Sequence, residues 1–336
     1  MPATIKDIKE QTGLSLATIS KYLNGGNVLP ENRIKIEAAI RDLHYEVNEL
    51  ARGLITKKTR MVGVLVYSVD SLFNGTLLKY IGDSLRKRGY GLLICDSNND
   101  EQVEAENVRF LVNKKVDGMI IVPVSKRSEF LKPAKNSGIP VVLLDRPLQD
   151  QEYDCVKIDN RMAAYRAVGS LIARQHKRIA IICSDQFLYT GNERYRGYMD
   201  AMEDAGFPVP EEYKKRGEHS IEYGYMSMKA LLALEERPTA VFMTNYEITL
   251  GAVMAVNESE LNCPEDISML GFDDLILSHV VSPRMCMIAQ PMKEMGEKAV
   301  GLLLKRIIGN ENEIPVEIVM STRIVAGNSI RELPVE

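Results

Sequence analysis

Residues 15–24 carry short hydroxyl, amide, apolar and cationic side chains, and a helical spacing would place most of them on one face. Hydroxyl and amide groups of this size bind the phosphate oxygens of DNA, and a lysine with small apolar neighbours reaches base edges in the major groove. This stretch is therefore a candidate for contact with DNA. The side chains expected on the outward face are Leu16, Ala17, Ser20, Lys21 and Asn24.

Two short helices joined by a glycine turn are predicted to position this face. Thr4 and Ser15 are good N-caps, and Gly13 permits the positive φ that a tight turn between helices requires. The pattern predicts a helix-turn-helix, which lays its second helix in the major groove. A small helical hairpin with a polar face is the alternative for so short a segment. The apolar residues expected to join the helices are Ile5, Ile8, Leu14, Thr18 (by its methyl group), Ile19 and Leu23.

A third helix is predicted to follow this pair. Gly25-Gly26-Asn27 would end the second helix, and Pro30 suits the first turn of another. Residues 1–60 hold 10 Lys and Arg against 7 Asp and Glu, whereas the whole chain holds 42 against 46. A basic N-terminal module on an acidic body directs the attraction to phosphate to one end of the molecule. The apolar side of the third helix is expected to consist of Ile34, Ala38, Ile40 and Leu43.

Length and composition bound the class of protein. A chain of 336 residues is too long for one typical hydrophobic core, so two or three domains are expected. Hydrophobic residues make up 45% and charged residues 26%, and no apolar run is long enough to cross a membrane. The N-terminus has no apolar signal-peptide core. Five scattered cysteines show no metal-ligand spacing, so we predict no disulfide framework, no metal and no cofactor, in a reducing cytoplasm.

Beyond residue 60, continuous apolar runs typical of buried parallel strands alternate with helix-like stretches. The expected strands are 61–67, 91–95, 118–122, 141–144, 179–183, 240–244 and 267–271. The expected helices are 77–88, 101–113, 162–174, 193–205, 223–234 and 249–259. The alternation comes in two blocks that meet near residue 160, and it predicts two doubly wound α/β lobes with helices on both faces. Ligands bind beyond the carboxyl ends of such strands, so a ligand cleft between the lobes is expected.

The order of these features resembles the LacI-type (lactose repressor) family of bacterial transcription regulators, and the resemblance extends over the whole chain. It implies a helix-turn-helix DNA-binding domain at 1–47, a hinge helix or linker at 48–60 and an effector-binding domain at 61–336. The effector-binding domain would be similar to periplasmic sugar-binding proteins, with lobe one at about 61–159 and 290–320 and lobe two at about 160–289 and 321–336. The matching N-terminal motifs are Thr4-x-x-Asp7-Ile8, Gly13-Leu14-Ser15, Thr18-Ile19-Ser20, Leu23-Asn24-Gly25, Tyr45-x-x-Asn48 and Ala51-Arg52-x-Leu54.

The resemblance also implies a homodimer on a near-palindromic double-stranded DNA operator. Leu54 would wedge into the minor groove at the centre of the site. Two residues depart from the family pattern: Lys9 stands where Ala is usual, and Val47 replaces the Pro before Asn48. The expected phosphate contacts are Ser15, Thr18, Ser20 and Asn24. The base-reading positions hold Leu16, Ala17 and Lys21, and Thr4, Asn48 and Ala51 complete the DNA-binding set.

Polar residues at predicted strand ends match the family's ligand contacts. Asp145 and Arg146 stand at an Asp-Arg pair that binds sugar hydroxyls, Arg194 begins an Arg-x-x-Gly motif, and Asp273 belongs to Gly-aromatic-Asp-Asp. Carboxylate and guanidinium groups bind adjacent hydroxyls in bidentate fashion, and aromatic faces pack on sugar rings. Tyr246 replaces the acid usual at its position. The full expected effector-binding set is Phe73, Asp145, Arg146, Arg194, Asn245, Phe272, Asp273 and Gln290.

The sequence offers little for catalysis, because its four histidines are dispersed and no phosphate-binding glycine motif is present. We therefore expect a cytoplasmic, nucleoid-associated repressor, neither an enzyme nor a membrane protein. Its operator affinity would be controlled by a sugar, sugar acid or sugar phosphate. Control by a protein co-regulator and an activating role are alternatives. A sugar-binding transport component is a further alternative, against which the helix-turn-helix and the missing signal peptide argue.

Overall fold

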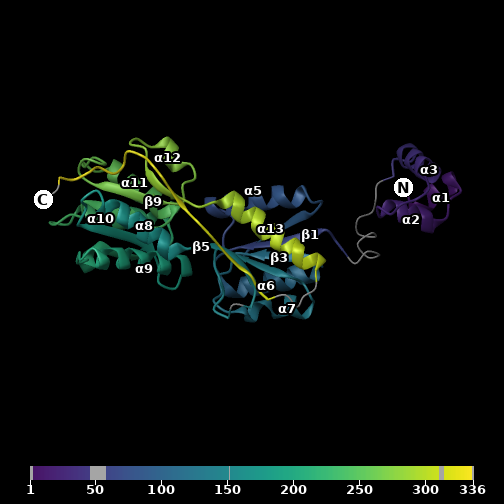
Figure 1. Cartoon of the computed structure of the whole chain (residues 1–336), viewed down its shortest axis with the longest axis horizontal. Helices are drawn as coiled ribbons and strands as arrows, with labels where there is room; N and C mark the ends of the chain where they lie inside the picture. The colour runs from purple at the N-terminus through teal and green to yellow at the C-terminus, as the bar shows by residue number, and fades with distance from the viewer. Residues whose placement is uncertain (1–2, 46–57, 151, 310–313, 335–336) are drawn as a thin grey trace. The chain divides into compact units, whose positions relative to one another are not determined.

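The computed structural model describes residues 3–45, 58–150, 152–309 and 314–334 (Figure 1). The chain forms two compact units. One holds the N-terminal helices up to Met61 together with Lys115–Asp117, and the other holds Val62–Lys114 and Gly118–Glu336. No helix within the described ranges combines the length and apolar character needed to cross a bilayer.

The N-terminal unit consists of helices α1 (Ile5–Thr12), α2 (Leu16–Leu23) and α3 (Pro30–Asp42). Gly13 follows α1 with a φ of 70°, which a residue with a Cβ rarely adopts, so the predicted glycine turn is confirmed. One fully buried residue from each of α1 and α2 meets α3. The centre of this small core is formed by Ile8, Ile19, Ile36 and Ala39.

The apolar side of α3 differs from the prediction at Ile34 and at Ala38, because the alanine that packs in the core is Ala39. Ile34 is 67% exposed, so its assignment to the packed face was wrong. Ile36, which is fully buried, lies two residues later and hence about 200° further around the helix axis. The buried stripe runs from Ile36 through Ala39 to Ile40 and Leu43, which pack at the usual spacing of three or four residues.

The larger unit contains two six-stranded sheets, and we call the first sheet with its helices lobe one. Its strand order is β11-β5-β4-β3-β1-β2, and the ladders from β11 through β1 are parallel. The strands are β1 (Met61–Val66), β2 (Gly91–Asp96), β3 (Gly118–Ile121), β4 (Val141–Leu144), β5 (Asp154–Ile158) and β11 (Glu317–Met320). The helices are α5 (Leu72–Arg86), α6 (Glu101–Asn113), α7 (Lys132–Asn136) and α13 (Met292–Ile308), with a 3₁₀ turn at Ser128–Leu131.

Lobe two is built on the second sheet, with order β12-β10-β9-β8-β6-β7. Its strands pair in parallel except for β12, which runs antiparallel to β10. The strands are β6 (Ile179–Ser184), β7 (Lys214–Gly217), β8 (Ala240–Met243), β9 (Ser268–Phe272), β10 (Cys286–Ala289) and β12 (Arg323–Val325). The helices are α8 (Asn160–Ile172), α9 (Tyr189–Asp204), α10 (Ile221–Leu232), α11 (Tyr246–Asn257) and α12 (Leu277–Val280), with a 3₁₀ turn at Glu211–Tyr213.

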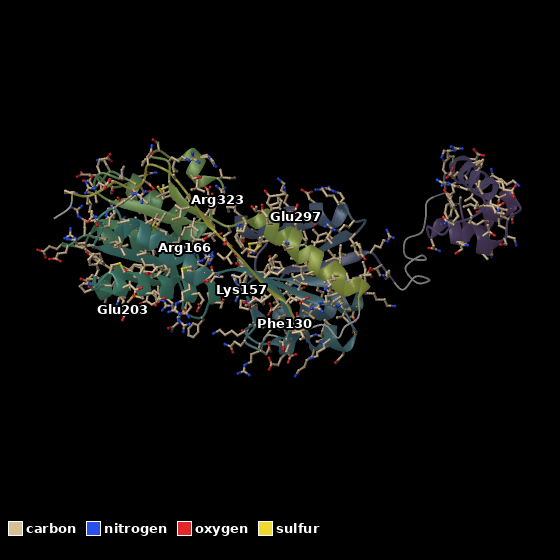
Figure 2. All side chains as sticks on the ribbon, in the orientation of Figure 1. Phe130, Lys157, Arg166, Glu203, Glu297 and Arg323 are labelled. Atoms are coloured by element: carbon tan, nitrogen blue, oxygen red, sulfur yellow. The ribbon has the colours of Figure 1, made fainter. Side chains whose placement is uncertain are left out.

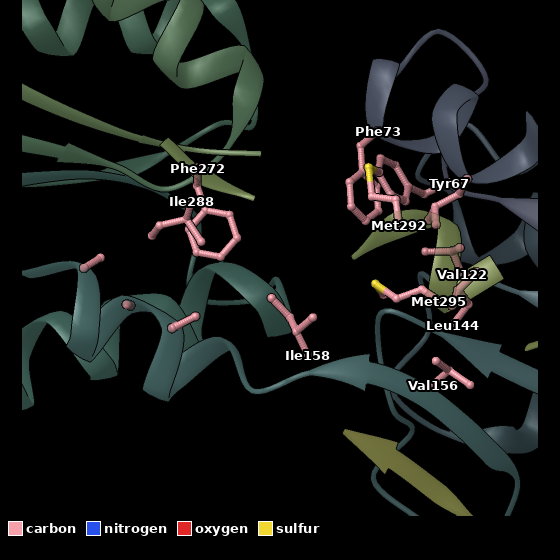
Figure 3. Close-up of a cluster of buried hydrophobic side chains, with 14 of the residues drawn as sticks. Tyr67, Phe73, Val122, Leu144, Val156, Ile158, Phe272, Ile288, Met292 and Met295 are labelled. Carbon is pink, nitrogen blue, oxygen red and sulfur yellow. The ribbon is translucent and has the colours of Figure 1, made fainter. Parts of the chain in front are cut away.

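The predicted architecture of two doubly wound parallel lobes is confirmed. Strand β1 shows why both faces need cover: Val62, Val64 and Val66 join the core under α5 and α13. On the opposite face, Gly63 lies so close to α6 that a Cβ would come within 2.8 Å of Leu111. The chain passes between the lobes three times, after β5, after β10 and between β11 and β12. Figure 3 shows buried side chains from both lobes, with Phe272 in lobe two and Phe73 in lobe one.

Candidate functional site

The first candidate surface is the outward face of α2. Leu16 is 38% exposed, and Ala17 and Lys21 are also exposed, so the three predicted base-reading side chains are open to solvent. Ser15 caps the helix, because its Oγ accepts a hydrogen bond from the backbone N–H of Thr18 at 3.1 Å. A free helix N-terminus with hydroxyl groups beside it attracts phosphate.

The remaining predicted DNA contacts take part in local hydrogen bonds. Asn24 donates from Nδ2 to the carbonyl of Ser20 at 2.8 Å, so it also closes the C-terminal turn of α2. Exposed Thr4 caps α1 and donates from its backbone N–H to Asp7 Oδ2 at 2.7 Å. The predicted hinge contacts Asn48, Ala51 and Leu54 lie outside the described residues.

A polar link that the sequence patterns did not indicate fixes α2 against α3. Tyr22 donates its hydroxyl to Glu37 Oε1 at 2.8 Å, and Arg33 donates Nε to the same oxygen at 2.8 Å. These two hydrogen bonds lower the pKa of Glu37, and the one from Arg33 has the larger effect. The orientation of the exposed α2 face therefore depends on a shared carboxylate as well as on the apolar core.

The second candidate site begins at the carboxyl end of β4 in lobe one. Asp145 follows this strand with a φ of 68° and is only 3% exposed. The guanidinium carbon of its neighbour Arg146 lies 4.2 Å from the ring centroid of Tyr67, and Nη1 donates to the carbonyl of Pro123 at 3.2 Å. Arg146 Nε also lies 3.6 Å from Asp145 Oδ2. The predicted Asp-Arg pair is thus buried, paired and held at the strand end.

A matching arrangement lies at the carboxyl end of β9 in lobe two. Asp273 follows this strand with a φ of 67° and is 5% exposed. Its Oδ2 lies 3.7 Å from Nη1 of Arg194, and its Oδ1 accepts a 2.6 Å hydrogen bond from Gln290 Nε2. Arg194 also stacks on the ring of Phe272, with 3.6 Å between the guanidinium carbon and the ring centroid, and donates Nε to Asn160 Oδ1 at 2.8 Å.

The two aspartates occupy equivalent places in the two lobes. β4 is third in the order of the first sheet and β9 is third in the second. Asp145 and Asp273 are both in the left-handed region of φ, which costs free energy for a residue other than glycine. Arg146 follows Asp145 and Arg194 lies beside Asp273, and each guanidinium stacks on an aromatic ring. The repeated strained geometry favours a function that needs both carboxylates held at strand ends.

Burial shapes the charges of these groups. It raises the pKa of Asp273 to about 6; the Arg194 guanidinium opposes the rise, and the carboxylates of Glu247 and Asp145 add to it. Burial likewise raises the pKa of Asp145, against the attraction of Arg146, Arg194 and His219. Because Arg194 and His219 belong to lobe two, the charge of Asp145 depends on both lobes.

Direct contacts join the lobes beside these pairs. Ser71 of lobe one donates its hydroxyl to Glu247 Oε1 at 3.2 Å, and the rings of Tyr67 and His219 lie 6.4 Å apart between centroids. Glu247 Oε2 lies 3.0 Å from Nε2 of His219. Burial opposes ionisation of Glu247, but the hydrogen bond and charge of His219, a backbone N–H and the Ser71 hydroxyl together outweigh it and lower the pKa of Glu247. We call the following set the interlobe polar cluster: Tyr67, Ser71, Asp145, Arg146, Arg194, His219, Glu247, Asp273 and Gln290.

The other predicted effector contacts, Asn245, Phe73 and Phe272, have capping or packing roles in the structure. Asn245 accepts from the N–H of Ile248 at 2.8 Å as the N-cap of α11, and its Nδ2 donates to Ser184 Oγ at 3.0 Å. Phe73, 6% exposed, packs in the core of lobe one, and Phe272 is fully buried beneath Arg194. Within the described residues, several buried polar atoms have no hydrogen-bond partner, among them Asp145 Oδ1, Arg146 Nε, Asn160 Nδ2, Thr244 Oγ1 and Gln290 Oε1.

Comparison with known proteins fits both surfaces. A family model described as a periplasmic binding protein-like domain matches residues 168–330. Catabolite control protein A of Priestia megaterium is 33% identical over 307 residues, which cover 91% of this chain and 92% of that protein. The chain belongs to the LacI-type family of transcription regulators. The HTH-type transcriptional repressor PurR of Pectobacterium carotovorum (strain PC1) is 32% identical over 325 residues, covering 96% and 95%.

A solved structure of a transcriptional regulator supports the same fold. The transcriptional regulator CelR in complex with cellobiose is 26% identical, covers 97% of this chain and 99% of its own, and superposes with a TM-score of 0.73. The relatives named here are transcription regulators rather than enzymes.

Four residues of this LacI-type regulator join the site without having been predicted. They are Tyr67, Ser71, His219 and Glu247 of the interlobe polar cluster, and the contact between Ser71 and Glu247 connects positions 176 residues apart. The sequence did contain one indication of Glu247. Tyr246 stands where the family usually has an acidic residue, and Glu247 supplies a carboxylate one residue later. Tyr246 itself is 7% exposed and packs in the core of lobe two.

Proposed function

We propose that this regulator is a homodimeric repressor that binds a near-palindromic operator and releases or tightens its hold when a small molecule binds between its lobes. The observation that carries the proposal is that the chain contains two features. One is an exposed face on α2, and the other is a set of buried, oppositely charged groups at the strand ends of both lobes. A regulator of this kind works on the nucleoid, in the cytoplasm.

In this proposal α2 enters the major groove. Lys21 reads or approaches a guanine edge as a point charge, which is less specific than the fork of an arginine. Leu16 and Ala17 are suited to thymine methyl groups. Ser15 and Thr18, whose hydroxyls lie 2.9 Å apart at the N-terminus of α2, would bind a phosphate, as would Ser20 and Asn24.

The hinge completes the proposed DNA contact. Asn48 and Ala51 would line a helix in the minor groove, and Leu54 would insert at the centre of the operator and kink it. A Leu54→Ala variant should then lose specific affinity and DNA bending, measured by anisotropy and by circular-permutation gel shift. Unchanged bending by this variant would remove the wedge from the mechanism.

The proposed dimer contact includes the edge of lobe one. β2 is an edge strand, and apolar side chains on it and its flanking helices are exposed: Ile94 by 46%, Leu72 by 44% and Phe110 by 42%. An uncovered edge with apolar side chains needs a partner to avoid unspecific pairing. A second copy of the chain would supply one. Sedimentation equilibrium of Ile94→Lys should then show weaker dimers than the unsubstituted protein.

The effector would bridge the interlobe polar cluster. The CelR structure is a complex with cellobiose, and by likeness a sugar or sugar derivative is proposed for this chain. Because a ligand that binds two conformations unequally must change DNA affinity, closure of the lobes and operator binding are linked reciprocally.

Selection of operators from a random double-stranded pool with the purified full chain tests the function. We expect a two-fold symmetric consensus, and Lys21→Ala should lower affinity for it by about tenfold while Lys298→Ala, an exposed change on α13, leaves it unchanged. Binding that shows no sequence preference would refute the regulator proposed here. The same assay identifies the effector as a small molecule whose addition changes the measured affinity for the operator.

A further inference from the structure

The interlobe polar cluster contains more carboxylates than guanidinium groups. Asp145 pairs with Arg146, and Asp273 pairs with Arg194, so each arginine already has a carboxylate partner. Glu247 is a third carboxylate, and its partners are the imidazole of His219 and the hydroxyl of Ser71. Each guanidinium of the cluster therefore already has a carboxylate within 4 Å, although the 3.6 Å between Arg146 Nε and Asp145 Oδ2 is too long for a hydrogen bond.

The charges act on one another across the cluster. Glu247 and Asp145 both make it harder to ionise Asp273, in addition to the effect of its burial. Glu247 and Asp145 act in the same direction on Tyr67. Since Glu247 is close enough to disfavour these negative charges, it is close enough to disfavour a ligand carboxylate or phosphate in the same place.

The unpartnered atoms point to the complementary ligand. Within the described part of the chain, Asp145 Oδ1 and Gln290 Oε1 are buried acceptors without a donor, whereas Arg146 Nε and Asn160 Nδ2 are buried donors without an acceptor. A hydroxyl group is both donor and acceptor and can satisfy either kind. A phosphate or carboxylate offers only acceptors, so it would leave the two oxygens unsatisfied and adjacent to its own charge.

We propose that the interlobe polar cluster selects an uncharged, polyhydroxylated ligand and that Glu247 is the residue that turns acidic analogues away. This inference rests on the proposed function, because it concerns the effector of that same site. Glu247 acts through its charge: Ser71 from lobe one and His219 from lobe two hold the two carboxylate oxygens in place. A ligand anion would add a negative charge to a cluster in which the three carboxylates already pair with Arg146, Arg194 and His219.

Matched ligand sets test the selection. Isothermal titration calorimetry of the full chain would use glucose, glucuronate and glucose 6-phosphate, then ribose and ribose 5-phosphate, then cellobiose and cellobionate. We expect an uncharged member of at least one set to bind more than tenfold tighter than its acidic counterparts. In Glu247→Gln that ratio should shrink by roughly tenfold, the effect of one charge about 10 Å away through an effective dielectric of about 20.

Two further variants separate charge from structure. Glu247→Asp keeps the charge and should keep the discrimination. Glu297→Gln makes the same chemical change at an exposed position of α13 (Figure 2) and should bind like the unsubstituted protein. Far-UV circular dichroism and operator affinity without ligand are measured for every variant, so that a misfolded protein is not mistaken for altered selectivity.

The outcomes are distinct. Tighter binding of an acid or phosphate than of its uncharged counterpart would overturn the proposal, and so would an unchanged ratio in Glu247→Gln. Failure of every compound to bind would also overturn it. In that case retention of operator binding by the same preparation would show that the DNA-binding part of the proposed function stands, and loss of operator binding would remove both.

Discussion

Replacing Asp273 by asparagine should change how stability depends on pH. The carboxyl of Asp273 has a pKa of about 6 in the folded protein, raised by burial from its ordinary value of 3.8. The folded state therefore binds the proton more tightly than the unfolded state. Stability from this group is fully present below pH 3.8 and is lost as the pH rises through about 6. The shift corresponds to about 3 kcal/mol.

The asparagine amide would not titrate, so the Asp273→Asn variant should gain on the unsubstituted protein as pH rises. We expect the difference in free energy of unfolding to move by about 2.5 kcal/mol in favour of the variant between about pH 4 and pH 8, because part of the unfolded-state carboxyl is already ionised at pH 4. Urea unfolding followed by far-UV circular dichroism at unit steps of pH measures it. The absolute difference at any one pH also contains the lost attraction of Arg194, which is why the change with pH is the informative quantity.

Asp200→Asn is the matched control of opposite sign. The hydrogen bond from Arg161 lowers the pKa of Asp200, so stability from that exposed pair is present at neutral pH and lost as pH falls through the folded pKa. The control variant should therefore lose ground to the unsubstituted protein as pH rises. A constant difference for Asp273→Asn across the same pH range would refute the account of a costly buried charge.

Three further outcomes follow from packing, capping and pairing. Gly197→Ala should lose about 2–3 kcal/mol of unfolding free energy, because its Cβ would lie 2.0 Å from the Arg161 carbonyl oxygen, whereas Gly169→Ala, with open space around it, should gain about 1 kcal/mol. Ser15→Ala should cost the N-terminal unit about 1 kcal/mol by loss of the cap, and Ser15→Asp should restore stability but weaken DNA binding through its charge. Asp154→Ala should cost about 3 kcal/mol, because it strips Arg306 of a buried bidentate partner.

Each of these has a result that would contradict it. Equal melting temperatures for the two glycine variants would mean that α8 and α9 can separate without cost. Full operator affinity in Ser15→Asp would show that no phosphate lies at the start of α2. For Asp154→Ala, chemical unfolding within about 0.5 kcal/mol of the parent would mean that the pair gives no net stabilisation.

The strands with the clearest apolar runs were predictable from the sequence, whereas the buried strands β5 and β10 were not predicted, because β5 contains Asp154 and Lys157 and β10 is only four residues long. The apolar run of β1 and that of β4 mark strands covered on both faces, and Val141–Leu144 matches its predicted range. Strand β7, which reads Lys-Lys-Arg-Gly, was not predicted, because an edge strand with half-buried side chains needs no apolar pattern. Strands β11 and β12 are similarly short and exposed. Edge strands are defined by their neighbours rather than by their own sequence.

The candidate site was predictable only in part for a related reason. Asp145 and Asp273 come directly after recognisable strands, so topology alone places them at sheet ends. Glu247 and His219 matter because they meet each other and Ser71 across the two lobes. No local pattern encodes such a meeting. The domain boundaries and the roles of the individual site residues stay predictions, which the variants above are designed to test.

The last strands of the two sheets have a consequence for synthesis. β11 completes the first sheet and β12 the second, and both come from the short stretch 317–325. Helix α13, which covers β3, β4 and β5, is itself made only after all of lobe two's other strands. A ribosome must therefore pass residue 320 before the first sheet has all six strands, and residue 325 before the second does. Until then the inner strands β5 and β10 each lack one neighbour, and it is in this interval that chaperone capture would protect the nascent chain.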